Sequence, residues 1–220
     1  MRKIKVLLVD DHHLVRTGIR RLLEDQAGET GIEVVGEASS GEEAITLARS
    51  HRPEVVMMDV SMPGIGGMEA TRRLLGHDPD LKIIALTVHA EGPFPRRLLK
   101  IGAMGYLTKG CGVEEMILAI RKAVSGEHYI SSDIAQQLAL ASVPGNQDSP
   151  FDALSQREMQ VLLMITEGYR AQAISKQLSL SPKTISTYKS RLQEKLKVKT
   201  DVELVRLALR HGVVGQGNVH

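Results

Sequence analysis

The chain has 220 residues, 42% of them hydrophobic, which is enough for one large packed domain or two small ones. Its single cysteine, Cys111, excludes an internal disulfide and a cysteine-based zinc cluster within this sequence, and an aromatic content of 3% disfavours stacking platforms for single-stranded nucleic acid. The net charge of +2 conceals an asymmetry, since residues 1–150 hold 17 basic and 20 acidic side chains and residues 151–220 hold 11 and 6. The basic second part is therefore expected to contact a polyanion, although a lysine-rich helix can also be only a solvated surface.

The N-terminal stretch MRKIKVLLVDDHH has too short an apolar core for a signal peptide, and no run of residues is long and apolar enough to span a bilayer. A single cysteine fits a reducing compartment. We therefore expect a cytoplasmic protein that is not itself embedded in a membrane.

Strand-like and helical patterns alternate over the first 126 residues. The runs VLLV (6–9), VVMM (55–58) and IIAL (83–86) are apolar throughout, as in a parallel sheet covered by helices on both faces. This pattern predicts a doubly wound α/β domain with a five-stranded parallel sheet. The expected strands cover residues 5–10, 33–38, 53–59, 81–87 and 104–108, and the expected helices cover 13–25, 40–50, 67–76, 96–102 and 112–126.

The second part of the chain has a helical pattern. An amphipathic helix is expected at 131–142, followed by a linker at 143–150 that is rich in glycine, proline and polar residues. Four helices with short connections then predict a small all-α bundle, at 154–168, 171–179, 181–197 and 201–212. We place the domain boundaries at 1–127, 128–150 and 151–220.

Polar side chains stand at the carboxyl ends of four expected strands. Asp10 and Asp11 follow the first, Asp59 ends the third, Thr87 ends the fourth, and Lys109 follows the fifth. Binding sites in open parallel sheets lie beyond the carboxyl ends of the strands. If these four strands are neighbours, three carboxylates, one hydroxyl and one amine converge there.

Three converging carboxylates need a compensating charge. Two unit charges 4 Å apart repel by about 4 kcal/mol at an effective dielectric constant of 20, so a proton or a divalent cation must lie among them. Oxygen ligands favour Mg2+ (or Mn2+). An aspartate beside the ion could then attack phosphorus and form an acyl phosphate, while Lys109 and the Thr87 hydroxyl hold the phosphoryl oxygens.

Other interpretations of these residues are simpler. An aspartate after a strand is commonly a turn or helix cap, and Asp59 alone would favour that. The set of polar residues at four strand ends reverses the preference. His12 and His13 open a helix and are expected to bind no metal. The sequence has no P-loop, and GIGG at 64–67 lacks the full dinucleotide pattern.

Four motifs in order resemble the receiver domain of two-component response regulators over residues 1–127. They are Asp10-Asp11, D-x-x-M-P-x-x-x-G at 59–67, Thr87, and Tyr106-x-x-Lys109. The resemblance implies that Asp59 accepts a phosphoryl group from a kinase histidine. It further implies a metal site made by Asp10, Asp11, Asp59 and the Ser61 backbone carbonyl, a switch pair of Thr87 and Tyr106, and a phosphoryl contact from Lys109. Gly110 follows Lys109 where many receivers have proline.

The segment 171–197 has helix-turn-helix spacing. The first helix stops near Leu178, and Ser181-Pro182 is an N-cap followed by a first-turn proline. Small polar side chains at the start of such a helix can approach base edges, while lysine and arginine bind phosphates. The residues expected to pack inward are Ile174, Leu178, Ile185, Leu192 and Leu196, and those expected to face DNA are Lys183, Thr184, Ser186, Thr187, Tyr188, Lys189, Ser190 and Arg191.

Three motifs in this part resemble the LuxR-type DNA-binding domain: L-S-x-R-E-x-Q-V-L at 154–162, E-G at 167–168 and S-P-K-T-I-S-T-Y at 181–188. The whole chain is thus similar to the NarL/FixJ class. The resemblance implies a recognition helix at about 182–197 and dimerisation through the final helix at about 201–211. It also implies that the side chains nearest the bases are those of Ser186, Thr187 and Ser190. GYRAQAIS at 168–175 departs from the usual pattern of the class.

Longer stretches resemble the GacA/UvrY group of that class, among them RRLLKIGAMGYLTKG (96–110), YISSDIAQQL (129–138) and VELVRLALRHG (202–212). A few extra residues near 27–31 are expected to lengthen a surface loop. The resemblance implies a membrane hybrid sensor histidine kinase as phosphodonor and transcription of small regulatory RNA genes from double-stranded promoter DNA as output.

We therefore predict a transcriptional regulator that dimerises on phosphorylation and is not an enzyme beyond its own phosphoryl transfer and dephosphorylation. Two alternatives remain open. One is a phosphatase with Asp59 as nucleophile, although the second residue after it is Ser61 and not the aspartate of dehalogenase-like phosphatases. The other is an adaptor that binds only proteins.

Overall fold

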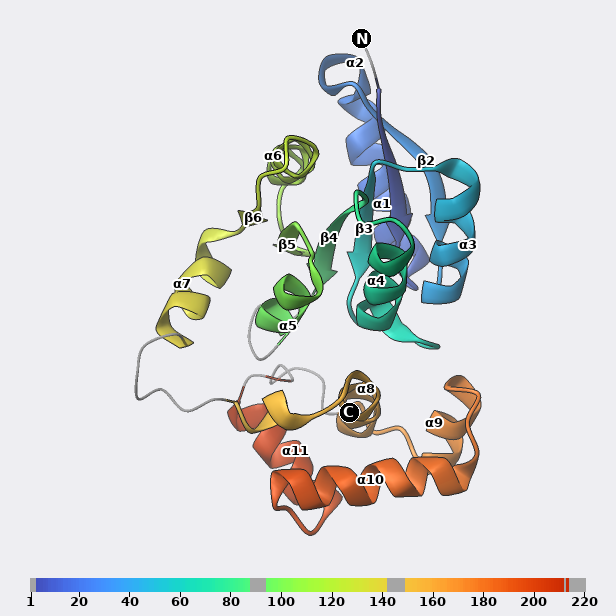
Figure 1. Ribbon diagram of the computed structural model, residues 1–220, viewed down its shortest axis with the longest axis vertical. Coiled ribbons are helices and arrows are strands. Elements are labelled where there is room, and N and C mark those ends of the chain that lie inside the picture. The colour runs from blue at the N-terminus through green and yellow to red at the C-terminus, as the bar shows by residue number, and fades with distance from the viewer. Residues whose placement is uncertain (1–2, 88–93, 142–148, 212, 214–220) are drawn as a thin grey trace. The chain divides into compact units, whose positions relative to one another are not determined.

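Figure 1 presents a computed structural model of the chain, which describes residues 3–87, 94–141, 149–211 and 213. The chain divides into two compact units, the first within residues 1–135 and the second mainly of residues 136–220.

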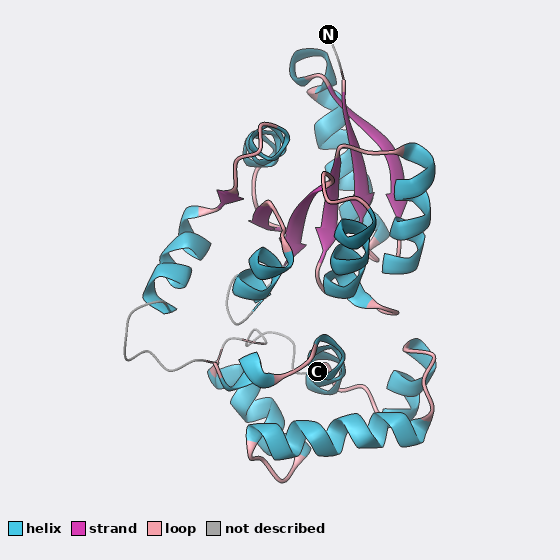
Figure 2. Cartoon of the chain, viewed as in Figure 1, coloured by secondary structure: helices cyan, strands magenta, loops and turns pink. Residues whose placement is uncertain are grey.

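The first unit is built on one parallel sheet (Figure 2, magenta) with strand order β2-β1-β3-β4-β5-β6. The strands are β1 (Ile4–Val9), β2 (Ile32–Ala38), β3 (Val55–Asp59), β4 (Lys82–Thr87), β5 (Gly105–Thr108) and β6 (Tyr129–Ile130). The prediction of five strands was one short. The sixth has two residues and pairs with β5 through a bond from the Tyr129 amide to the Met104 carbonyl at 2.9 Å, and no periodicity can reveal so short a strand.

The helices of this unit follow the predicted order. They are α1 (His13–Asp25), α2 (Ala27–Thr30), α3 (Gly41–His51), α4 (Gly66–His77), α5 (Phe94–Ile101), α6 (Val113–Val124) and α7 (Ser132–Ala141), the last of which reaches the second unit. The extra residues near 27–31 were expected to form a loop but form the short helix α2, which ends at Gly31 in the left-handed region. Ser40 caps α3 as predicted, since its hydroxyl accepts a bond from the Glu43 amide.

Both faces of the sheet are covered by helices, which explains the continuous apolar runs. Side chains from α1 and α6 pack on one face with alternate strand residues such as Leu8 and Met57, and side chains from α3 and α4 pack on the other with Leu7 and Met58. All four residues of the run 55–58 are fully buried. The sheet therefore provides a rigid frame whose strand ends position the polar residues that follow.

Gly67 allows α4 to start directly against the end of β3. A Cβ at this position would lie 1.9 Å from the Asp59 carbonyl oxygen, so only glycine fits. The glycine that closes the motif at 59–67 thus fixes the distance between the helix and Asp59.

Three α-helices of the second unit start at side-chain caps. Ser155 and Glu158 form a capping box, and Ser181 and Thr200 cap the next long helices. The five residues predicted to pack inward around the helix-turn-helix are all buried. The elements are η1 (Pro150–Ala153), α8 (Gln156–Thr166), α9 (Ala171–Gln177), α10 (Pro182–Leu196) and α11 (Asp201–Arg210).

The predicted linker at 143–150 falls largely outside the described residues. Its last residue, Pro150, begins η1, for which the Ser149 hydroxyl serves as N-cap. Among the helices that the structure describes, none is long and apolar enough to cross a membrane.

Candidate functional site

The strand order places the predicted polar residues at one edge of the sheet. β1, β3, β4 and β5 are consecutive neighbours, as the sequence argument required. Their carboxyl ends carry Asp10, Asp59, Thr87 and Lys109, and the first three are nearly or fully buried. The convergence expected from the sequence therefore occurs.

Lys109 joins the two buried carboxylates. Its ammonium nitrogen lies 2.6 Å from Asp10 Oδ2 and 2.7 Å from Asp59 Oδ2. The other oxygen of Asp59 accepts a bond from the Ser61 amide at 3.0 Å, which orients the carboxylate. Ser61 is thus held beside Asp59.

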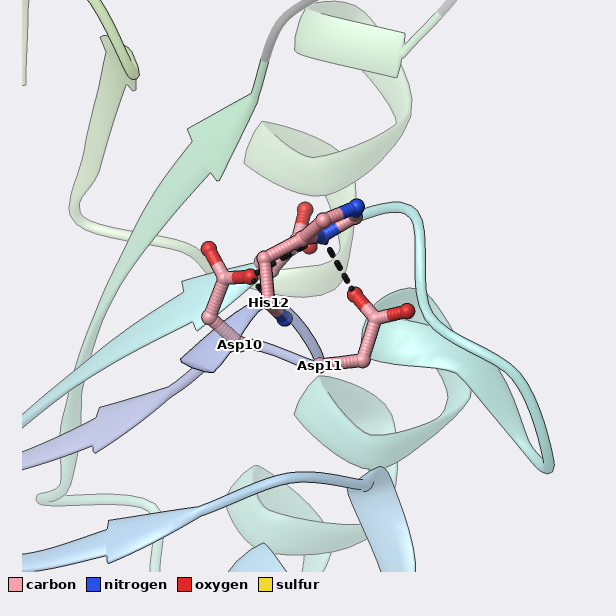
Figure 3. Close-up of side chains that lie close together, drawn as sticks. Asp10, Asp11 and His12 are labelled. Atoms are coloured by element: carbon pink, nitrogen blue, oxygen red, sulfur yellow. Dashed lines mark hydrogen bonds and ion pairs between the residues drawn. The ribbon is translucent and has the colours of Figure 1, made fainter. Parts of the chain in front are cut away.

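Asp11 and His12 complete the outer side of the site (Figure 3). The His12 Nδ1 atom lies 3.0 Å from Asp11 Oδ1 and 3.4 Å from Asp10 Oδ1, while the His12 amide donates to Asp10 Oδ1 at 2.8 Å. One ligand atom from each of Asp10, Asp11, His12 and Asp59 lies within 4.8 Å of all the others. This group could hold a metal ion.

Burial dominates the electrostatics of Asp59. It raises the pKa of this carboxyl to about 7, with Asp10 adding to the rise and Lys109 and the Ser61 amide opposing it. Burial lowers the pKa of Lys109, but Asp59 and Asp10 outweigh it, so the pKa of the ammonium lies above its usual value. With the carboxylates ionised, three acids and one ammonium leave a net charge of −2, which a divalent cation would neutralise.

Thr87 on β4 and Tyr106 on the neighbouring strand β5 contact each other. Both are completely buried, and a hydrogen bond joins their hydroxyl groups. Burial raises the pKa of Tyr106 well above its usual value, and the bond to Thr87 only partly offsets this. Tyr106 is therefore a neutral side chain. Its hydroxyl is hydrogen-bonded to the hydroxyl of Thr87, the residue that ends β4 at the site.

Arg16 is a residue of this region that the sequence argument missed. Its Nη1 atom donates to the Asp10 backbone oxygen at 2.5 Å, and its Nε atom donates to Glu37 at 3.3 Å. Arg20 binds the other oxygen of Glu37 at 2.8 Å. The signal that could have found Arg16 is its place on the same helical face as His12, four residues earlier.

In the second unit, α9, a tight turn and α10 form the helix-turn-helix. Ser179 occupies the left-handed region with φ +52°, and the turn is closed by a bond from the Ser175 hydroxyl to the Leu180 carbonyl at 2.6 Å. Ser181 accepts a bond from the Thr184 amide at 3.1 Å, and Pro182 follows it in the first turn. The helix thus begins where the sequence predicted and ends one residue earlier.

Two contacts anchor α10 and the turn to α8. Lys195 pairs with Glu158 at 2.7 Å, and Arg157 donates to the Leu178 carbonyl at 3.1 Å. Glu158 is 3% exposed; burial would raise the pKa of its carboxyl, but Lys195 and Ser155 hold it below the usual value. The basic residue Lys195 therefore supports the scaffold.

Most of the side chains predicted to face DNA are accessible. Lys183, Ser186, Thr187, Ser190 and Arg191 are exposed, whereas Thr184, Tyr188 and Lys189 are half-buried. Lys189 donates to Asp201 at 2.6 Å, a pairing that the sequence did not indicate.

Known protein families match both parts of the chain. The description "Response regulator receiver domain" matches residues 6–121, and "Bacterial regulatory proteins, luxR family" matches residues 152–208. The chain belongs to the LuxR-type response regulators. It therefore combines a phosphorylatable receiver with a LuxR-type DNA-binding domain.

Among its relatives is the response regulator GacA of Pseudomonas aeruginosa, 57% identical over 212 residues, which cover 96% of this chain and 98% of the relative. The response regulator UvrY of Escherichia coli is 54% identical over 211 residues, with 96% and 95% covered. A solved structure of Salmonella typhimurium RcsB is 28% identical with a TM-score of 0.71, covering 94% of this chain and 96% of that one. An RcsB–DNA complex is 27% identical with a TM-score of 0.58, covering 94% and 98%.

These findings confirm the predicted class and its closeness to GacA and UvrY, and the predicted fold apart from the sixth strand. The role assigned to each site residue stays a prediction.

Proposed function

We propose that this chain is a transcriptional regulator that is activated by phosphorylation of Asp59. The observation that supports this best is the buried Asp59 carboxylate, held between Lys109 and the Ser61 amide at the ligand-binding edge of the sheet. A sensor histidine kinase supplies the phosphoryl group. On the resemblance to GacA and UvrY, this kinase is a membrane-bound hybrid kinase.

The transfer needs few protein groups. An Asp59 oxygen attacks phosphorus, the bond from phosphorus to the donor histidine nitrogen breaks, and its electron pair leaves with the imidazole. Lys109 can shift from the carboxylates to the phosphoryl oxygens, since it lies within 2.7 Å of the reacting group.

Asp10, Asp11 and Asp59, with the Ser61 carbonyl, would hold Mg2+ or Mn2+. The donor set fits such an ion because it supplies oxygen ligands close together and an excess of negative charge. When bound, the ion neutralises charge on the carboxylates and on the phosphoryl group.

Thr87 and Tyr106 would convert phosphorylation into a change of shape. The phosphoryl group adds about −1.5 to −2 charge and three acceptor oxygens. These oxygens compete for the Thr87 hydroxyl, which is bonded to Tyr106. Exchange of this bond would alter β5 and α5, and this surface would promote dimerisation or release of the DNA-binding domain.

The DNA-binding domain would insert α10 into the major groove of promoter DNA. Ser186, Thr187 and Ser190 lie on its exposed surface and would approach the bases, while the remaining predicted residues would contact phosphates. α11 would form the dimer contact, so that two copies bind an inverted repeat. From the resemblance to the GacA/UvrY group, we also propose that the chain activates transcription of small regulatory RNA genes.

The domain boundaries 1–127, 128–150 and 151–220 belong to the same proposal. Fragments 1–127 and 151–220 should each unfold cooperatively in thermal melts. A fragment without a melting transition would show that its boundary is misplaced.

The decisive experiment is labelling with acetyl phosphate in the presence of Mg2+. Wild type should take up one phosphoryl group and Asp59→Asn none, as seen by intact mass. Labelling of Asp59→Asn at the wild-type level would refute the assignment. Multiple turnover of a small phosphate ester would instead favour a phosphatase.

DNA binding is tested by retention of genomic fragments with and without phosphorylation. Binding should weaken steeply with salt, because lysine and arginine displace counterions from the phosphates. Failure to retain any DNA fragment, with a stable protein partner recovered, would favour the adaptor.

A further inference from the structure

His12 lies where a ligand of the proposed metal site would lie. Figure 3 shows its ring beside the carboxylates of Asp10 and Asp11, with Nδ1 facing both. Its backbone is fixed at the start of α1, because its amide donates to Asp10 and its carbonyl accepts from Arg16 at 3.1 Å. The ring is 67% exposed, so it can rotate and an ion can enter from solvent.

The separations fit adjacent ligands of one ion. For a metal–ligand bond of about 2.1 Å, neighbouring octahedral ligands lie roughly 3.0 Å apart and opposite ones roughly 4.2 Å apart. His12 Nδ1 is 3.0 Å from Asp11 Oδ1 and 3.4 Å from Asp10 Oδ1, and the whole set, including Asp59, falls within 4.8 Å. Small movements would therefore bring one nitrogen and three oxygens onto a single ion.

Contrary to the expectation from the sequence, we propose that His12 is a ligand of this metal site and gives it a preference for first-row transition ions over Mg2+. The inference rests on the proposed metal site. Mg2+ favours oxygen ligands and keeps several waters, so an imidazole adds little to its binding. Transition ions bind imidazole well, so His12 raises their affinity selectively.

The neighbouring histidine provides a matched control. His13 is also exposed and follows directly in the chain, but it does not belong to the group of possible ligands found among the described residues. Exchange of His13 for glutamine therefore tests the general loss of a histidine at the start of α1 without touching the site.

The experiment uses the untagged full chain with Mn2+ as probe. Pulsed electron paramagnetic resonance detects nitrogen bound to Mn2+, and isothermal titration gives affinities for Mn2+ and Mg2+. Wild type and His13→Gln should show the coupling to an imidazole nitrogen. His12→Gln should lose it and bind Mn2+ about tenfold more weakly, with Mg2+ affinity changed less than about twofold.

Two results would overturn the inference: bound Mn2+ without nitrogen coupling in wild type, or coupling that persists in His12→Gln. Asp11→Asn separates this failure from that of the metal site. If Asp11→Asn lowers Mn2+ affinity while wild type lacks nitrogen coupling, the metal site stands and only the role of His12 is wrong. If Asp11→Asn leaves Mn2+ affinity unchanged, the metal site is misplaced and both proposals fail.

Discussion

Replacement of Gly67 by alanine tests the close approach of α4 to Asp59. The added Cβ would lie 1.9 Å from the Asp59 carbonyl oxygen and 2.9 Å from both the Asp59 carbonyl carbon and Val60 Cα. All three are backbone atoms, so no side chain can rotate away. Gly67 is not among the glycines with positive φ, so the obstacle is space and not the backbone torsion.

The cost follows from the required movement. Ordinary contact begins near 3.4 Å, so α4 and the end of β3 would have to separate by 1.5 Å. Overpacking costs about 1–3 kcal/mol and occasionally more, and a clash with rigid backbone falls at the upper end. About 3 kcal/mol in a domain of this size lowers the melting temperature by roughly 10 °C.

The assay is thermal unfolding followed by circular dichroism, with acetyl phosphate labelling of the same samples. Gly76→Ala is the matched control, because it lies on the same helix and its Cβ meets nothing within 4 Å. That variant should gain about 0.5–1 kcal/mol of stability. If Gly67→Ala melts within about 2 °C of Gly76→Ala, the approach of α4 to Asp59 is wrong.

Three further predictions concern charge. In metal-free buffer Asp59→Asn should have a higher melting temperature than wild type at about pH 8, and this gain should vanish toward about pH 4. Burial raises the pKa of Asp59 from 3.8 to about 7, so the folded state binds more protons than the unfolded state between these values. Wild type therefore loses stability as the pH rises through this range. A pH-independent difference would contradict this. Arg16 is expected to position Asp10 through its bond to the Asp10 carbonyl, so Arg16→Met should weaken Mg2+ binding about tenfold in titration calorimetry. Arg20→Met leaves that contact intact and should not weaken binding. Equal effects of the two substitutions would refute the role of Arg16. Asp201 competes with DNA phosphates for the Lys189 ammonium, and removing roughly 1 kcal/mol of this attraction in Asp201→Asn should raise DNA affinity about fivefold. Unchanged affinity in a binding titration would show that the pairing does not affect DNA binding.

The local features of this chain could be predicted from its sequence. The buried run before Asp59, the cap at Ser40 and the start of α10 after Ser181 all depend on residues within a few positions of one another. Periodicity, capping and turn chemistry act over that range, so the order of helices and strands followed directly. Gly67 was also visible in the sequence as part of a motif. The nearby Asp59 carbonyl oxygen, which leaves no space for a side chain at this position, was not.

Tertiary structure decided which of these residues meet. Lys109 and Asp59 lie 50 residues apart in the chain, and only the strand order β1-β3-β4-β5 brings them within 2.7 Å. The same holds for Lys189, which reads as a DNA contact in the sequence and is paired with Asp201 in the structure. The sequence gives no reason to distinguish His12 from His13, yet among the described residues only His12 lies close to the carboxylates of the site. The sequence placed the polar residues at strand ends, but whether those ends are neighbours depends on packing between distant elements, which no local pattern encodes.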